Sequence, residues 1–245
     1  MKQIILFDIG SYDGKEFLNI AENHSNVMIY AFEPTPWAAE KIRNKTKHLP
    51  NFKLIEKAIC LKNGKCLLNI AKVDQNQSNS GCNSIHNFSD TWKEDFPHAH
   101  NYYGTINKIE VETIRLDTFI EQNNIPYIDF LHVDAQGEDL NVLKSLGKYK
   151  NIVREGVIET ATNKELSIYN DNPDILDCIL WFKKNDFILS QITPNDLSTV
   201  TFTIEHNIRF RHKTNIPKHF NYLLIYKNNH MEPYKLILEN QYRPL

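Results

Sequence analysis

The chain of 245 residues lacks the features that mark several large classes of protein. No apolar run approaches the roughly 18 residues of a membrane span, so no transmembrane helix is predicted. The charges are balanced, with 28 basic against 30 acidic residues, which argues against a generally basic protein that coats nucleic acid. The apolar start, Ile4–Phe7, is too short for a signal-peptide core and precedes no small-residue cleavage site, so a cytoplasmic location is expected.

Cysteine and glycine are also scarce. The four cysteines form no C-x-x-C pair, which argues against a zinc ribbon or a redox motif and fits reduced thiols: Cys60, Cys66, Cys82 and Cys178. Glycine occurs only 8 times, whereas 41% of the residues are hydrophobic and 24% are charged, as in ordinary globular proteins. With no internal repeat and no linker, residues 1–245 are expected to form a single domain.

Apolar runs typical of buried strands alternate with helical patterns along the chain. The expected strands are Lys2–Phe7, Val27–Phe32, Phe52–Ile59, Lys65–Ala71, Ile109–Ile114, Ile128–Val133, Val153–Ile158, Phe187–Ile192 and Tyr222–Tyr226. The expected helices are Lys15–Glu22, Trp37–Lys47, Leu116–Gln122, Asp139–Leu146 and Pro173–Lys184. This order predicts an α/β fold with a doubly wound, mostly parallel sheet, to which the late strands add an antiparallel edge strand.

One long polar segment, Asp74–Lys108, interrupts the alternation. Structureless segments of this length in compact domains are usually functional or disordered, and here we predict a lid over a binding site. Its aromatic residues, Trp92, Tyr102 and Tyr103, would stack on a ligand or anchor the segment. Its histidines fit no standard zinc spacing and are interpreted as solvated: His86, His98 and His100.

The first expected strand ends in the sequence Asp8–Gly14, in which D-x-G-x-x-x-G leads into a helix. Glycines allow the backbone to approach a ligand, and a helix N-terminus offers free N–H groups to an anion. Glu33 ends the next strand, where an acid can accept both hydroxyls of a ribose. The spacing departs from the G-x-G-x-x-G of dinucleotide sites, whereas an acid before the first glycine suits an ammonium group. S-adenosylmethionine fits these groups; the alternative is a glycine-containing turn with incidental acids.

Three segments resemble successive blocks of one known family, the FkbM-type methyltransferases. These segments are Phe7–Gly14, Tyr30–Pro36 and Val111–Leu146, and the similarity extends from Ile4 to about Ile192. The resemblance implies the Rossmann-like fold of class I methyltransferases and S-adenosylmethionine as cofactor. It also implies methylation of a hydroxyl group, often on a sugar or a polyketide.

The resemblance also implies which residues hold the cofactor. Asp8, Gly10 and Asp13 would hold its methionine end, and Glu33 its ribose. The remaining cofactor residues would be those that adjoin these positions, flank the adenine or match a Ser-Leu-like element: Ser11, Tyr12, Gly14, Pro34, Ala58, Ile59, Ser84 and Ile85.

The fourth parallel strand departs from the family pattern Lys-x-Asp-x-Glu-Gly. Asp134 is retained, but His132 stands in place of the lysine and Gln136 in place of the glutamate. Any role that needs a cation or a second carboxylate at these two positions is therefore left open.

Methyl transfer to oxygen needs a group that takes the hydroxyl proton. Asp134, His132 and Glu159 end or line strands on the expected rim and are the catalytic candidates. The alternatives are that His132 is a buried histidine bonded to a backbone carbonyl and that Asp134 caps the following helix. Asp134 and Glu159 could instead hold Mg²⁺ or Mn²⁺.

The acceptor is expected to be a sugar, a nucleotide-sugar or a glycan, and the oligomeric state is left open. A basic cluster between the last two expected strands would meet phosphates or form a solvated loop: Arg209, Arg211, His212, Lys213 and Lys218. An RNA methyltransferase is a second interpretation, although the fourth strand lacks the Asn/Asp-Pro-Pro-aromatic run of base methylation. A binding module without activity is a third, because fold alone does not fix function.

Overall fold

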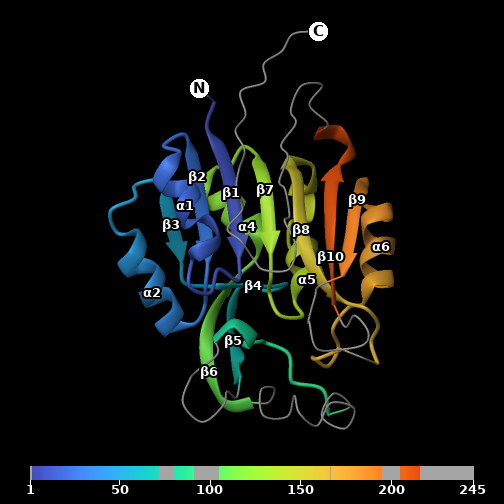
Figure 1. Cartoon of the computed structure of the whole chain (residues 1–245). Helices are drawn as coiled ribbons and strands as arrows, with labels where there is room; N and C mark the ends of the chain where they lie inside the picture. The colour runs from blue at the N-terminus through green and yellow to red at the C-terminus, as the bar shows by residue number, and fades with distance from the viewer. Residues whose placement is uncertain (1, 72–79, 91–104, 166, 195–204, 216–245) are drawn as a thin grey trace.

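The computed structural model describes residues 2–71, 80–90, 105–165, 167–194 and 205–215. Its main feature is a seven-stranded sheet with the order β3-β2-β1-β7-β8-β10-β9 (Figure 1). In that order the strands are Phe52–Ile55, Val27–Phe32, Ile4–Ile9, Ile128–Val133, Val153–Ala161, Glu205–His212 and Phe187–Pro194. The predicted strand Tyr222–Tyr226 lies outside the described residues.

Helices cover both faces of this sheet. Successive side chains of a strand point to opposite faces, and the central strands are mostly apolar, so both faces need cover. Ile5 and Phe7 of β1 belong to one buried cluster with residues of α4 (Leu116–Asn123), α5 (Asp139–Lys144) and α6 (Ile175–Lys184). Ile4 and Leu6 point the other way and pack with α1 (Lys15–Asn23) and α2 (Pro36–Thr46). The predicted doubly wound arrangement is thus confirmed. None of the described helices has the length and apolar character to cross a membrane.

The sequence predicted an antiparallel strand at the edge of the sheet. In the structure the antiparallel strand is β10, which is the second strand from the edge. β10 pairs antiparallel with both β8 and β9, so β9 forms the edge and runs parallel to the other strands. The sequence analysis missed β10, because Ile208 and Phe210, both fully buried, alternate with polar residues. Arg209, Arg211 and His212 of the expected basic cluster therefore belong to a strand, and Arg211 pairs with Glu155 at 3.1 Å. Lys213 begins a short 3-10 turn, and Lys218 lies outside the described residues.

A second, three-stranded sheet has the order β4-β6-β5 and consists of Ala58–Ile59, Thr105–Ile114 and Gly64–Ala71. The predicted continuous strand Phe52–Ile59 is wrong, because β3 pairs with β2 in the large sheet whereas β4 pairs with β6 in the small one. β5 and β6 extend beyond the carboxyl ends of β1, β2 and β7 (Figure 1). The small sheet thus forms a wall at the end of the large sheet where ligands bind in such folds.

We predict that Phe210→Ala destabilises the protein by about 3–5 kcal/mol, the usual cost of removing a buried phenyl ring. The ring of Phe210 lies 4.9 Å from that of Phe182 and 5.3 Å from that of Phe187. Lys213→Ala serves as the control, because its ion pair with Asp186 is exposed and contributes little. Urea unfolding checks this, and equal midpoints for the two variants would contradict the assignment of β10 to the core.

Candidate active site

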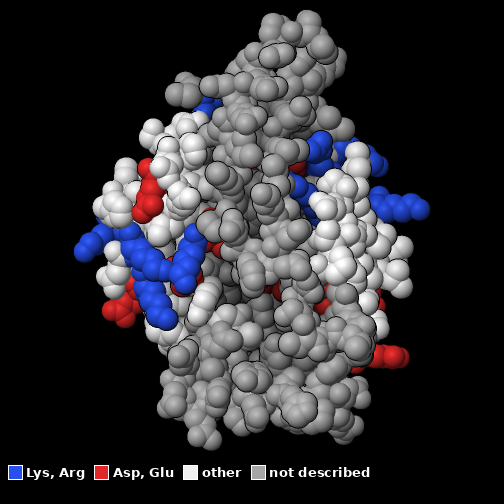
Figure 2. Space-filling view, viewed as in Figure 1, with Lys and Arg blue, Asp and Glu red and all other residues white. Residues whose placement is uncertain are grey.

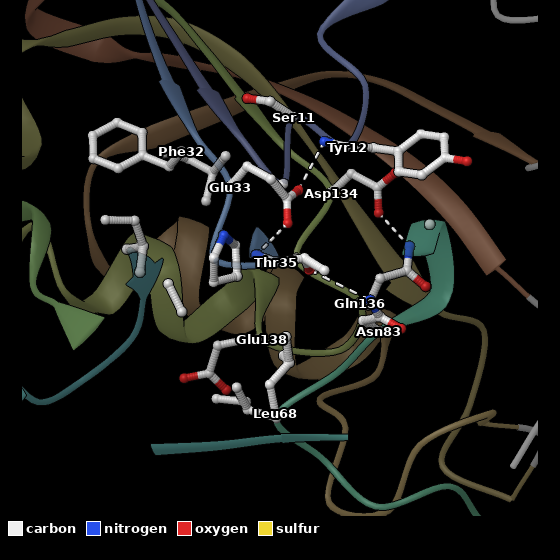
Figure 3. A pocket seen from close by; sticks show the side chains of 18 of the residues that line it. Ser11, Tyr12, Phe32, Glu33, Thr35, Leu68, Asn83, Asp134, Gln136 and Glu138 are labelled. Carbon is white, nitrogen blue, oxygen red and sulfur yellow. Dashed lines mark hydrogen bonds between the residues drawn. The ribbon is translucent and has the colours of Figure 1, made fainter. Parts of the chain in front are cut away.

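A cavity of about 620 Å³ opens at the carboxyl ends of β1, β2 and β7 (Figure 3). Its size is that of a small-molecule site. The structure brings nine of the predicted cofactor residues to its wall: Gly10, Ser11, Tyr12, Asp13, Glu33, Pro34, Ala58, Ile59 and Ile85.

Three predicted cofactor residues do not line the cavity and support its wall instead. Gly14 precedes α1 with a left-handed φ of 71°. The Ser84 hydroxyl donates a hydrogen bond of 2.6 Å to the carbonyl of Gln136. Asp8 is buried beneath α1 and bonds to His132.

Gly10 permits the closest approach in the site. Its φ is 83°, and a Cβ at this position would lie 1.9 Å from the carbonyl oxygen of Asp134. Asp134 in turn donates its backbone N–H to the carbonyl of Ile9 at 2.9 Å. Only glycine combines this φ with this approach, and the turns after β1 and β7 therefore lie in contact.

Glu33 is a buried carboxylate with defined partners. Its Oε2 accepts the backbone N–H of Tyr12 at 2.9 Å, and its Oε1 accepts that of Thr35 at 2.7 Å (Figure 3). Burial raises the pKa of Glu33 to about 7, although the hydrogen bonds from Thr35 and Tyr12 act to lower it. Each carboxylate oxygen has a further lone-pair site, so Glu33 can also accept hydroxyl groups of a ligand.

Asp134 lines the cavity, and Gln136 donates its side-chain N–H to the Asp134 Oδ1. Burial raises the pKa of Asp134, while the charge of His132 and the bond from Gln136 act to lower it. Asp134 is not the N-cap of α5, because that position is held by Glu138. Glu159 lies on β8 but is not among the residues that line the cavity.

His132 lies in a buried ionic cluster instead of in the cavity. Its Nδ1 is 2.8 Å from Asp8 Oδ1 and 3.3 Å from Glu16 Oε2. Burial lowers the pKa of His132, but the carboxylates of Glu16 and Asp8 outweigh this effect and raise that pKa to about 10. These two carboxylates therefore favour the protonated, imidazolium form of the ring. Its placement outside the cavity lining argues against the predicted role as a base, and the two carboxylates near its Nδ1 are partners that the sequence analysis did not foresee.

The described residues give no support to the predicted Mg²⁺ or Mn²⁺ site at Asp134 and Glu159. Within the described ranges, a search for three or more possible ligands finds Asp8, Glu16 and His132, but no such group with Asp134 or Glu159. We therefore derive no step through a metal.

Part of the predicted lid belongs to the cavity wall. Gly81 and Cys82 of the 3-10 turn η1 (Ser80–Cys82), Asn83 and Ile85 line the cavity. Residues 105–108 of the predicted segment are the start of β6. Residues 74–79 and 91–104, with Trp92, His98, His100, Tyr102 and Tyr103, lie outside the described residues.

The sequence analysis missed a hydrogen-bonded pair beside the cavity. His86 Nε2 lies 2.8 Å from Glu138 Oε2, and Glu138 lines the cavity. His86 is therefore paired and largely buried, with 16% of its side chain exposed, and the prediction of a solvated residue is wrong. The sequence analysis also assigned no role to Gln136, because only the fold brings the side-chain partners of Gln136 together.

Residues 8–189 match the model of a protein family that is described as "Methyltransferase FkbM domain". The chain belongs to this methyltransferase family. It is also similar to the 2-O-methyltransferase NoeI of Sinorhizobium fredii, with 28% identity over 142 residues, which cover 57% of this chain and 56% of that protein. The match thus spans just over half of the length of that relative.

Solved structures of similar fold include an rRNA methylase from Streptococcus thermophilus, with a TM-score of 0.46, 10% identity and coverage of 86% of this chain and 87% of that one. TrmK of M. capricolum, solved with S-adenosylhomocysteine, has a TM-score of 0.45, 10% identity and coverage of 85% and 62%. The fold is the Rossmann-like α/β fold of class I methyltransferases, on the evidence of the sheet order and the family match.

We predict that Gly10→Ala lowers the free energy of unfolding by more than Gly64→Ala. Both glycines have positive φ, of 83° and 132°, but a Cβ at Gly64 would meet nothing within 4 Å. Backbone strain alone costs about 1–3 kcal/mol, and Gly10→Ala adds the clash with the Asp134 carbonyl. Urea unfolding of both variants checks this, and similar losses would show that the two turns do not depend on their contact.

Proposed function

We propose that this methyltransferase uses S-adenosylmethionine to methylate a hydroxyl group of a sugar or glycan. The observation that carries the proposal is that two carboxylates, Glu33 and Asp134, line the same cavity. Glu33 is buried and suits the hydroxyls of a ribose, whereas Asp134 suits a hydroxyl acceptor. The family match supports methyl transfer, and it leaves the acceptor to be determined.

In this proposal the cofactor lies along the carboxyl ends of β1 and β2. The ribose hydroxyls donate to Glu33, and the methionine end lies at the turn from Gly10 to the start of α1. The adenine packs against the apolar side chains of Ala58, Ile59 and Ile85. This orientation brings the sulfonium methyl group to the Asp134 end of the cavity.

The acceptor oxygen attacks the methyl carbon in line, and the carbon–sulfur bond breaks with its electron pair left on sulfur, which yields S-adenosylhomocysteine. The hydroxyl proton passes to Asp134, which acts as general base. The protonated His132 favours the ionised form of Asp134 through its positive charge and acts without contact with the acceptor. Glu159 does not line the cavity and is assigned no step in this proposal.

A sugar is favoured over RNA by the formal net charge of −2, because RNA-binding domains usually carry a basic net charge. In Figure 2 the Lys and Arg side chains of the described residues lie in groups on the two sides of this face. The similarity to a protein named as a 2-O-methyltransferase adds support for a hydroxyl acceptor.

We expect Glu33→Ala to weaken the binding of S-adenosylhomocysteine at least about tenfold, because hydrogen bonds to charged groups contribute about 1.5–3 kcal/mol. Glu56→Gln is the control, since Glu56 is half exposed and pairs with Arg43. Isothermal titration calorimetry measures both affinities. Equal affinity of wild type and Glu33→Ala would remove the ribose assignment.

The same binding should depend on pH. The pKa of Glu33 is raised to about 7, and hydroxyl donors favour its ionised form. The affinity for S-adenosylhomocysteine should therefore rise as the pH increases through about 7 and level off above it, because below that pH the bound proton must first be released. Glu33→Gln should reduce this rise in calorimetry between pH 5.5 and 8.5, and an unchanged pH profile in this variant would contradict the assignment.

We expect Asp134→Asn to slow methyl transfer on the order of a hundredfold at saturating cofactor, the usual contribution of a positioned base. The assay measures S-adenosylhomocysteine formed in a screen of sugars, nucleotide-sugars and capped RNA. A near-normal rate would exclude Asp134 as the base. Turnover with RNA but with no sugar would replace the acceptor class, and cofactor binding without any turnover would favour a binding module.

A further inference from the structure

Gln136 is held in one orientation by the groups around it. Its Nε2 donates to Asp134 Oδ1, and its Oε1 accepts the hydroxyl of Tyr169 at 2.6 Å. Its backbone carbonyl accepts the Ser84 hydroxyl at 2.6 Å, and its φ of 49° is left-handed, which is uncommon outside glycine. Figure 3 shows the Gln136 amide directed toward the Asp134 carboxylate at the edge of the cavity. The donor end of the amide thus faces the proposed base.

Tyr169 is fixed in turn. It is 2% exposed, and its ring lies 5.2 Å from that of Phe88. Its hydroxyl also lies 3.1 Å from the carbonyl of Cys82, a residue of the cavity wall. If the Gln136 amide were reversed, its oxygen would face the Asp134 carboxylate, and two acceptors would repel each other. The Tyr169 hydroxyl has a single proton, and its shorter contact, 2.6 Å to Oε1 against 3.1 Å to the Cys82 carbonyl, favours the amide orientation in which Oε1 is the acceptor.

We propose that Tyr169 and Gln136 form a positioning relay for Asp134, in which Tyr169 orients the amide and the amide holds Oδ1 so that Oδ2 is left to receive the acceptor proton. Both are positioning residues, since they act through Asp134. The inference rests on the proposed function of Asp134 as the base. It also links the base to the cavity wall, through the contact between Tyr169 and Cys82.

An amide suits this task better than the carboxyl group of the family pattern. An amide N–H donates at every pH and favours the ionised carboxylate, whereas two adjacent carboxyls share a proton and raise one pKa. Six other titratable groups interact electrostatically with Asp134, and none of them is changed in the variants tested below. These groups are Asp8 (β1), Glu16 (α1), Cys82 (η1), His132 (β7), Asp139 (α5) and Glu205 (β10).

The experiment measures the titration of Asp134 directly and needs no methyl acceptor. The full chain is labelled with ¹³C at the aspartate carboxyl, and the Asp134 resonance is assigned by its loss in Asp134→Asn. Gln136→Glu should move the Asp134 midpoint upward by about one pH unit or more, and Tyr169→Phe should move it upward by a smaller amount. The affinity of Tyr169→Phe for S-adenosylhomocysteine should stay within about threefold, since Tyr169 does not line the cavity.

Matched controls remove comparable groups elsewhere. Tyr149→Phe removes a hydroxyl that bonds to Glu121 at 3.0 Å on the surface, and Gln122→Glu adds a carboxyl on the exposed side of α4. Both should leave the Asp134 midpoint unchanged.

An unchanged Asp134 midpoint in folded Gln136→Glu would overturn the relay. A loss of S-adenosylhomocysteine binding in Tyr169→Phe without a shift of the Asp134 midpoint would also overturn it, because that result indicates a structural role only. If Tyr169→Phe does not fold, Gln136→Glu alone decides. A shifted midpoint in a protein that methylates no hydroxyl compound would support the relay and reject the acceptor class, so the two failures are distinguishable.

Discussion

The contact between the turns that follow β1 and β7 is the constraint on which the rest of the site depends. Gly10 has no Cβ, so the carbonyl of Asp134 can lie where a side chain would otherwise stand. The hydrogen bond from the Asp134 N–H to Ile9 fixes this register. One turn leads to the N-terminus of α1 and the other carries Asp134 and Gln136. The proposed cofactor and acceptor ends of the cavity are therefore set by a single backbone approach.

The site also depends on ionisable side chains that are buried together. Asp8, Glu16 and His132 form a cluster beneath α1, where an isolated charge would be costly to desolvate. The imidazolium compensates for its neighbouring carboxylates and lies close enough to affect Asp134 as well. At the position where the resemblance implies lysine, this chain has a histidine whose protonated form is favoured by the carboxylates beside it. The charge of His132 acts to lower the pKa of Asp134, against the burial that raises it.

Local patterns predicted the parts of the fold that local chemistry determines. The buried strand before Gly10 and the acid Glu33 at the end of the next strand were found this way, and the structure places both residues at the cavity. The features that were missed depend on contacts distant in sequence. β10 gains its place from two apolar residues in a polar segment, and His132 was interpreted without knowledge of Glu16, which only packing of α1 brings close. Gln136 gains its proposed role from Tyr169, a residue that no motif marked.

The most direct test of the account is a crystal structure of the full chain grown with S-adenosylhomocysteine at a pH above 8, where Glu33 is expected to be ionised. The account predicts ribose hydroxyls within about 3.2 Å of the Glu33 carboxylate, the adenine against Ala58 and Ile85, and the sulfur directed toward Asp134. A ligand bound outside the cavity, or bound with its sulfur directed away from Asp134, would contradict it.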